Sequence, residues 1–230
     1  MDVNVFRRVE QKYLITNEQR EKLLELINEY IEKDEYFESQ ICNIYFDNKD
    51  NEIIHTSLEK PPFKEKVRLR SYSVPKLDSK VFFEIKDKYK GIVGKRRIKL
   101  KLEEYYDYLE NGNKQDTQIM KEIDYYYKMY NLEPFVFVGY DRKSYKGKKD
   151  KHLRLTFDQN LRYRFDDLKL DSGDHGKKYF DDDHCIMEIK ILDSMPLWLA
   201  SSLSKCKIYP KSFSKVGSIY AKNKRSESVC

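Results

Sequence analysis

Charged residues recur two positions apart in segments that otherwise have the composition of β-strands. The tripeptide Glu-x-Lys occurs at 10–12, 84–86 and 188–190, and Arg68 and Arg70 stand at the same spacing. Side chains at positions i and i+2 lie on the same face of a strand, so each pair gathers its charges on one face. Mostly apolar residues occupy the intervening positions. The pattern therefore predicts strands with one charged face and one apolar face.

This pattern has two interpretations. Ion pairs on a solvent-exposed sheet face are common and need no ligand. Four strands of the same design, together with the basic cluster 95–97, favour instead a barrel with apolar side chains outward under helices and charges inward. Basic side chains converging on such a lumen neutralise a linear polyanion, and its carboxylates meet phosphates through Mg²⁺ or Mn²⁺. The charges alone thus indicate phosphates and a divalent metal together.

The elements that must position these charges follow from the periodicity of the sequence. Strands are predicted at 3–15, 37–46, 63–72, 80–88, 95–102, 135–145, 152–164 and 185–192. Helices are predicted from a capping box at 16–19 to about residue 32, and at 52–58, 103–110, 119–130 and 196–205. The polar segment 166–183 is expected to be an exposed loop. The predicted fold class is α+β, an eight-stranded antiparallel β-barrel (tunnel) with a charged lumen and helices packed outside.

Composition limits the classes of protein. The net charge of +6 on 230 residues is the difference between 45 Lys and Arg and 39 Asp and Glu. One core of ordinary size is expected, in a single domain over 1–222, with 223–230 as a frayed tail. No stretch of about 18 apolar residues occurs, so we expect a soluble, cytoplasmic protein. Free thiols are expected at Cys42, Cys185, Cys206 and Cys230, which form no C-x-x-C pair.

Several function classes find no support in the sequence. There is no P-loop motif, and no Ser-His-Asp or Cys-His arrangement indicates nucleophilic catalysis. Zinc-finger and RNP-like motifs are absent, and basic residues alternate with acidic ones along strands instead of forming one stripe. We therefore expect no nucleic-acid partner.

Eight motifs in order along the chain carry a resemblance to a known family. They are Arg8-Val-Glu-Gln-Lys-Tyr13, Asn43-Ile-Tyr-Phe-Asp47, Lys66-Val-Arg-Leu-Arg70, Phe83-Glu-Ile-Lys86 with Gly94-Lys-Arg-Arg97, Tyr140-Asp-Arg142, Arg154-Leu-Thr-Phe-Asp158, Met187-Glu-Ile-Lys190 and Phe213-Ser-Lys215. Together they resemble the VTC domain, the catalytic module of the vacuolar transporter chaperone and its bacterial relatives, within the triphosphate tunnel metalloenzymes.

The resemblance implies an ATP-dependent polyphosphate polymerase. In such an enzyme the γ-phosphoryl group of ATP is transferred, with Mn²⁺ or alternatively Mg²⁺, to a polyphosphate chain held in a basic tunnel, and ADP leaves. The implied phosphate ligands are Lys12, Arg68, Arg70, Lys86, Lys95, Arg142, Arg154 and Lys215, with Lys190 as a weaker candidate. The implied metal ligand is Glu188, with Glu10 and Glu84 as further metal ligands or as ion-pair partners in the lumen.

The sequence departs from the family pattern at two places. Arg8 occupies the first acidic position of the wider superfamily's E-x-E-x-K motif, which leaves fewer metal-binding carboxylates and favours polymerase over triphosphatase. Near the C-terminus, Ser212 replaces the first Lys of a K-F-S-K motif, although Lys211 is adjacent. In the basic cluster, Lys95 and Arg97 share a strand face, and we expect Lys95 to be the phosphate ligand ahead of Arg97.

Two other functions remain open at this stage. A tunnel phosphohydrolase of tripolyphosphate or nucleoside triphosphates would use the same lumen with water as acceptor. A non-catalytic sensor would only bind polyphosphate or inositol polyphosphates. The expected partners are ATP, inorganic polyphosphate, pyrophosphate as a primer, and a membrane protein that holds the enzyme at the inner face of a membrane.

Overall fold

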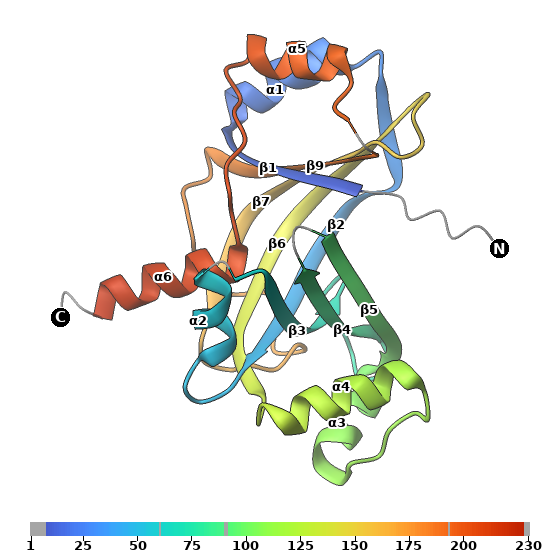
Figure 1. Ribbon diagram of the computed structural model, residues 1–230, viewed down its shortest axis with the longest axis vertical. Helices are drawn as coiled ribbons and strands as arrows, with labels where there is room; N and C mark the ends of the chain where they lie inside the picture. Colours follow the sequence, from blue (N-terminus) through green and yellow to red (C-terminus); the bar gives the residue numbers. More distant parts are fainter. Residues whose placement is uncertain (1–7, 60, 90–91, 193, 228–230) are drawn as a thin grey trace. The chain divides into compact units, whose positions relative to one another are not determined.

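A computed structural model of the chain describes residues 8–59, 61–89, 92–192 and 194–227 (Figure 1). Its strands are β1 (Arg8–Thr16), β2 (Ile31–Asp47), β3 (Phe63–Ser71), β4 (Lys80–Tyr89), β5 (Ile92–Lys101), β6 (Glu133–Gly147), β7 (Arg154–Arg164), β8 (Lys177–Lys178) and β9 (His184–Leu192). Its helices are α1 (Asn17–Ile27), α2 (Glu52–Leu58), α3 (Leu102–Asn111), α4 (Gln118–Met129), α5 (Leu197–Lys205) and α6 (Lys215–Glu227). Residues 3–7 of the first predicted strand lie outside the described part.

The strands form one sheet in the order β1-β9-β7-β6-β2-β3-β4-β5, with the two-residue β8 paired to β7. The pairs β1–β9, β7–β9, β2–β3, β3–β4 and β4–β5 are antiparallel. The predicted α+β class with an antiparallel sheet is therefore confirmed. Closure of a barrel requires backbone hydrogen bonds between the two edge strands, and within the described residues the sheet order ends at β1 and β5 without such a pair. The sheet is thus not closed by strand pairing, in contrast to the expected barrel.

The described chain divides into two compact units built from interleaved segments. Unit 1 consists of 1–39, 140–161 and 180–213, and unit 2 consists of 40–139, 162–179 and 214–230, each within the limits of the described residues. The strands β2, β6 and β7 contribute residues to both units. The single domain expected over 1–222 stays a prediction.

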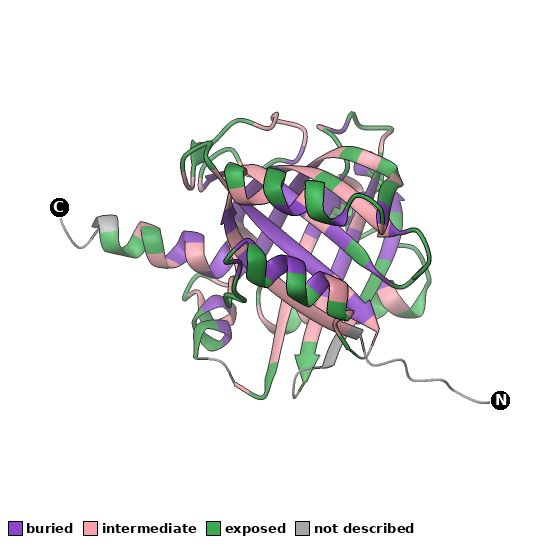
Figure 2. Cartoon of the chain, turned by 90° about the horizontal axis from the view of Figure 1, so that it is seen from above, coloured by how far each residue is buried: buried purple, intermediate pink, exposed green. Residues whose placement is uncertain are grey.

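In unit 1, the apolar face of β1, β7 and β9 packs against α1 and α5. Tyr13, Phe157 and Met187 come from the strands, and Leu23 and Leu199 from the helices; each is at most 1% exposed. In Figure 2, which views the chain from above, strands with buried residues run beneath two helices. Helix α1 begins at the predicted capping box. It ends five residues before the predicted end at residue 32, because β2 already starts at residue 31.

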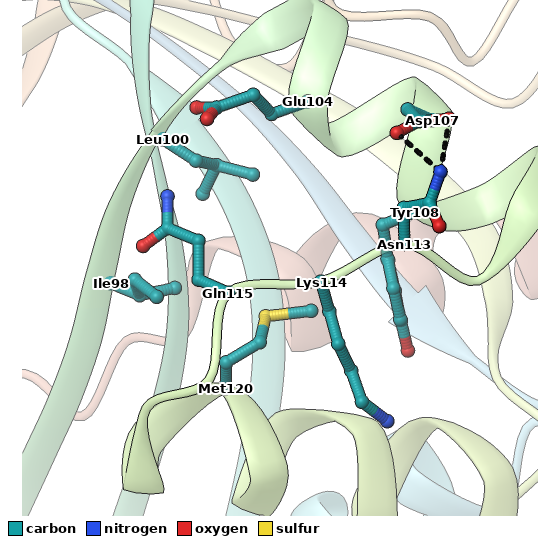
Figure 3. Close-up of a pocket in the computed structure, with 9 residues that line it drawn as sticks. All are labelled: Ile98, Leu100, Glu104, Asp107, Tyr108, Asn113, Lys114, Gln115 and Met120. Carbon is teal, nitrogen blue, oxygen red and sulfur yellow. Dashed lines mark hydrogen bonds between the residues drawn. The ribbon is translucent and has the colours of Figure 1, made fainter.

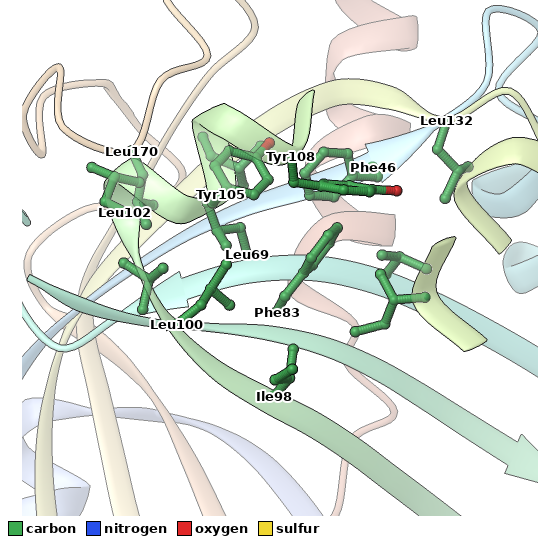
Figure 4. Close-up of a cluster of buried hydrophobic side chains, with 14 of the residues drawn as sticks. Phe46, Leu69, Phe83, Ile98, Leu100, Leu102, Tyr105, Tyr108, Leu132 and Leu170 are labelled. Atoms are coloured by element: carbon green, nitrogen blue, oxygen red, sulfur yellow. The ribbon is translucent and has the colours of Figure 1, made fainter. Parts of the chain in front are cut away.

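In unit 2, the apolar face of β3, β4 and β5 packs against α3 and α4 (Figure 4). Phe83 is fully buried, and its ring meets the Tyr105 ring edge-on at 5.6 Å between centroids. Full burial of a Phe side chain contributes about 1.5–3 kcal/mol of stability. Because this core occupies one side of the three strands, their charged side chains lie on the other side.

The segment predicted as an exposed loop is partly built into unit 2. Leu170 is only 1% exposed. The Arg164 guanidinium donates hydrogen bonds to the backbone carbonyl oxygens of Asp167, Lys169, Gly173 and His175. The prediction was wrong for this part, because one buried arginine satisfies carbonyl groups that would otherwise need water.

The C-terminal residues expected to fray are helical as far as Glu227 in α6, and 228–230 lie outside the described residues. Cys42, Cys185 and Cys206 are buried free thiols, as predicted, and Cys230 is not described. None of the described helices has the length and apolar character needed to cross a membrane.

Candidate functional site

The charged side of β3, β4 and β5 in unit 2 is dominated by basic side chains. The register places Lys66 opposite Lys86, Lys86 opposite Lys95, Arg68 opposite Glu84, and Glu84 opposite Arg97, and Arg70 follows Arg68 in the same row. Since directly opposed residues point to the same side of a sheet, these side chains share one face. We call this set the cationic face: Lys66, Arg68, Arg70, Glu84, Lys86, Lys95 and Arg97. Arg96 lies on the opposite side, where it pairs with Glu122 of α4 at 2.8 Å.

Glu84 is the acidic centre of the cationic face. Its carboxylate is fully buried and accepts from Arg68 Nε at 2.7 Å, while Lys95 Nζ lies 2.8 Å and Arg97 Nη1 4.0 Å from Oε1. Burial by itself raises the pKa of Glu84, but Arg68 and Lys95 outweigh it and hold that pKa below its ordinary value. Glu84 therefore forms ion pairs that orient Arg68 and Lys95, and its role in the site stays a prediction.

Lys95 is affected in the opposite direction. Partial burial lowers the pKa of Lys95 to about 8, although the bond to Glu84 opposes this shift. Arg68 and Arg70 add to the lowering by repulsion. Lys95 thus loses its charge within the range of ordinary assay conditions unless an anion stabilises it.

Arg70 differs from its neighbour Arg68. It is only 6% exposed, and within the described residues its guanidinium makes no hydrogen bond and no ion pair within 4.0 Å. It lies over the Tyr72 ring at 5.0 Å, and the nearby charge of Glu84 is already bound by Arg68 and Lys95. A buried charge without a direct counter-ion is costly. This position is therefore suited to an anion supplied from outside the protein.

Two further predicted ligands of unit 2 lie near the start of α6. Lys66 Nζ donates to Ser214 Oγ at 2.9 Å, and Ser214 Oγ also accepts from the backbone N–H of Gly217 at 3.2 Å. Lys215 is the first residue of α6 and is half-buried, as is Lys86 on β4. The predicted residues Arg68, Arg70, Lys86 and Lys95 share the cationic face, while Lys215 comes from the helix.

In unit 1, charges of both signs alternate across β1, β9 and β7. The register opposes Glu10 to Lys190, Lys12 to Glu188, and Lys190 to Arg154. Lys190 Nζ lies 2.9 Å from Glu188 Oε1 and 3.9 Å from Glu10 Oε2, and Lys12 Nζ lies 3.4 Å from Glu10 Oε1. The structure thus brings five predicted site residues of unit 1 to one strand face. The side chain of Arg8 is not described.

Arg142 is held by a residue to which the sequence analysis gave no role. Its Nε and Nη2 donate to the two carboxylate oxygens of Asp158 at 2.6 and 2.8 Å. Burial lowers the pKa of Arg142, but the Asp158 carboxylate more than compensates and keeps it well above its ordinary value. Asp158 ends the quoted motif that begins at Arg154, and its place on a strand beside buried residues was the available signal.

Residues 211–213, the part of the C-terminal motif region that belongs to unit 1, run beside β1. The backbone N–H of Lys211 donates to the carbonyl oxygen of Lys12 at 2.7 Å, and Lys12 Nζ donates to the carbonyl oxygen of Phe213 at 3.3 Å. Lys211 and Ser212 are exposed. The backbone, and not the side chain of Ser212, therefore makes the contact with β1.

The carboxylates of unit 1 fit only one kind of metal site. Across the described chain, no three His, Cys, Asp or Glu side chains gather into a protein-only metal cage. Glu188, which is 7% exposed, and Glu10 both lie beside Lys190. Mg²⁺ and Mn²⁺ are commonly held by one or two carboxylates with substrate phosphates and water as the remaining ligands. The donor set fits that arrangement, with Glu188 and Glu10 as the residues that would hold the ion.

A separate cavity of about 250 Å³ lies in unit 2 between β5 and the α3–α4 connection (Figure 3). Its lining includes Ile98, Leu100 and Met120, and its one basic residue, Lys114, is paired with Asp124. It contains no residue of the cationic face. This cavity is therefore not a site for phosphates.

Comparison with known proteins agrees with this geometry. The family model of the VTC domain matches residues 7–222. The fold is similar to the crystal structure of a candidate adenylate cyclase from Bacillus halodurans, with a TM-score of 0.56 and 14% sequence identity over 90% of this chain and 93% of that chain. It is also similar to a candidate adenylyl cyclase from Hippeastrum with a dominant triphosphatase activity, with a TM-score of 0.55 and 12% identity over 94% and 96%. No curated protein sequence matches significantly.

The family match spans nearly the whole chain and includes every predicted site residue. Both structural neighbours share the fold of this chain over at least 90% of its length. The resemblance drawn from the eight motifs is thereby confirmed. The chain belongs to the VTC domain family.

Proposed function

We propose that this protein is a polyphosphate polymerase that transfers the γ-phosphoryl group of ATP to a growing inorganic polyphosphate chain and releases ADP. The observation that carries the proposal is Arg70, a buried guanidinium that has no direct counter-ion among the described residues and lies among basic residues around the carboxylate of Glu84. Such a face has a large excess of positive charge, which a run of phosphates neutralises. A family of enzymes that act on phosphates provides the context.

In phosphoryl transfer the protein mainly positions the reacting phosphates. Phosphoryl transfer proceeds mainly through alignment of the reacting groups and neutralisation of developing charge, and it needs no protein nucleophile. Arg68, fixed by Glu84, offers a preset direction for a phosphate, and Arg70 offers a bidentate fork. Lys95 contributes a movable charge that an incoming phosphate keeps protonated.

The residues of unit 1 have complementary roles in the proposal. Lys12, Arg142, Arg154 and Lys190 bind phosphate oxygens, and Asp158 keeps Arg142 oriented. Glu188, with Glu10, holds Mn²⁺ or Mg²⁺, which when bound neutralises phosphate charge. A cytoplasmic location, and a membrane-protein partner that receives the product, stay predictions.

The activity of the Hippeastrum protein supports a second candidate function for this chain. Its dominant triphosphatase activity shows that water serves as acceptor in one protein of similar fold. In the present chain a hydrolase would use the same cationic face, with water in place of the polyphosphate end. A phosphate sensor would keep binding without turnover.

One experiment separates these functions. Purified protein is incubated with ATP and Mn²⁺, with and without pyrophosphate or short polyphosphate as primer, while ADP, free phosphate and long-chain polyphosphate are measured together. We expect ADP and long chains to rise with little free phosphate. Free phosphate without chains would identify a hydrolase, and tight polyphosphate binding without any turnover would identify a sensor.

Two variants serve as controls. Glu188→Gln should abolish turnover while polyphosphate binding largely persists, because the metal ligand is lost and the cationic face is not changed. Glu32→Gln, in an exposed pair with Lys146 at 3.3 Å in the same unit, should leave both turnover and binding unchanged.

A further inference from the structure

Two aromatic side chains interrupt the cationic face at one end of β3 and β4. Phe82 stands opposite Arg70 on β3 and opposite Lys99 on β5, so it lies on the charged side of the sheet and not in the core. Tyr72 directly follows β3 and is 47% exposed. Their ring centroids lie 5.7 Å apart, with the rings edge to face. We call these two residues the aromatic platform.

Each ring of the platform carries an arginine. Arg70 Cζ lies 5.0 Å from the centroid of Tyr72, and Arg97 Cζ lies 4.6 Å from that of Phe82. Both arginines belong to the cationic face. The platform therefore combines π surface with positive charge, the combination with which proteins hold a nucleobase beside its phosphates.

The position of the platform along the strands also matters. Arg68 and Arg70 lie two residues apart on β3, about 7 Å along the strand, and Tyr72 follows one residue after the strand ends, with its ring beside the Arg70 guanidinium. A row of phosphates on Arg68 and Arg70 thus ends next to the Tyr72 ring. An inorganic polyphosphate has no group that could stack on the Tyr72 ring. A nucleoside triphosphate, in contrast, has a ribose and a base beyond its last phosphate.

The core does not account for either ring. The neighbouring Phe83 points to the opposite side of β4 and is fully buried against the helices, while Phe82 is only half-buried and outside that cluster. A single exposed ring needs no explanation, but Tyr72 and Phe82 contact each other, and adjoining exposed apolar groups are typical of a ligand-binding site. The ring pair is therefore best explained by a ligand with a flat, stacking surface.

We propose that Tyr72 and Phe82 form a subsite that stacks the base of a nucleoside triphosphate whose phosphates lie on the cationic face. This inference rests on the proposed function and assigns the binding of the donor's base to two named residues. Stacking of one base on an aromatic side chain is worth about 1–3 kcal/mol, or roughly five- to 150-fold in affinity.

The test compares two ligands that share the triphosphate. Dissociation constants for a non-hydrolysable ATP analogue and for tripolyphosphate are measured by calorimetry on the wild type, Tyr72→Ala and Phe82→Leu. We expect each substitution to weaken binding of the ATP analogue at least about fivefold. Tripolyphosphate binding should change less than about twofold, because the cationic face that holds it is retained.

The same pair of strands supplies a matched control. Phe63 and Tyr89 face each other across β3 and β4, are 47% and 51% exposed, and lie on the opposite side of the strands from the platform. Phe63→Ala should therefore leave the affinities of both ligands unchanged. Thermal unfolding of each variant confirms that it is folded.

Equal weakening of both ligands in the platform variants, or no change in either, would overturn the base subsite. If the wild type binds neither ligand, the subsite and the proposed function fail together. If the nucleotide preference depends on the platform but the wild type only releases free phosphate from ATP, the polymerase fails and the base subsite stands.

Discussion

At the scale of single residues, the contrast between two neighbouring arginines carries most of the functional argument. Arg68 is bound by the buried carboxylate of Glu84, so its charge is balanced within the fold. Arg70, two residues later on the same strand face, has no such partner among the described residues. A structural arginine is paired in this way, whereas an unpaired buried one favours a role in binding.

Substitution of Arg70 should therefore affect binding much more than stability. Arg70→Leu is expected to weaken tripolyphosphate binding about 10- to 100-fold, since a charged hydrogen bond contributes about 1.5–3 kcal/mol. Its unfolding free energy should stay the same or rise, because a buried uncompensated charge is removed. Calorimetric titration and urea unfolding measure the two effects. Unchanged affinity together with lost stability would show that Arg70 is structural.

Lys95 predicts a pH dependence of anion binding. Since its pKa is lowered to about 8, the free protein loses this charge as the pH rises through 8, whereas an unfolded lysine keeps its proton to about 10.4. Tripolyphosphate affinity should therefore fall between pH 7 and 9, with the midpoint above 8 because the bound anion raises that pKa. Stability runs the other way, since the penalty of a charged Lys95 is fully present below pH 8 and declines between pH 8 and about 10.4.

The control for this titration is a residue that stays charged. Lys95→Arg should bind tripolyphosphate with little change between pH 7 and 9, because an arginine keeps its proton throughout. An equal fall in affinity in the wild type and this variant would assign the pH dependence to another group.

At the scale of elements, the sequence predicted which strand positions carry charged side chains. It did not predict which charged side chains pair with one another. The two-residue periodicity of strands correctly placed Arg96 on the opposite side of β5 from Lys95 and Arg97. It gave no indication that Glu84 binds Arg68 and Lys95, since strand order and register bring them together. The segment after Arg164 looked polar and exposed because its structure depends on the guanidinium of the preceding Arg164, a side chain-to-backbone contact without sequence periodicity.

The buried ion pair between Arg142 of β6 and Asp158 of β7 predicts an effect on the free energy of unfolding. Asp158 is fully buried and holds Arg142 through two hydrogen bonds. Asp158→Asn should lower the unfolding free energy by about 3–5 kcal/mol, because it leaves a buried guanidinium uncompensated. Urea unfolding checks this against Glu32→Gln, a surface variant expected to change little. A stable Asp158→Asn protein would show that Arg142 is well solvated.

At the scale of the whole molecule, the charge distribution predicts how polyphosphate binding responds to salt. The formal net charge of +6 understates the local field, because the cationic face carries six basic residues and one carboxylate. Polyphosphate affinity should fall about tenfold or more between 50 and 200 mM salt, as in other complexes of basic proteins with linear polyanions. Fluorescence anisotropy with labelled polyphosphate measures this. Affinity independent of salt would show that phosphate charge contributes little.

The most direct test of the central claim is a crystal structure of the protein with tripolyphosphate bound. We expect a phosphate oxygen within about 2.7–3.2 Å of the Arg70 guanidinium, with Arg68 still bound to Glu84. Tripolyphosphate bound elsewhere, with Arg70 still without a partner, would contradict the assignment of the cationic face as the phosphate site.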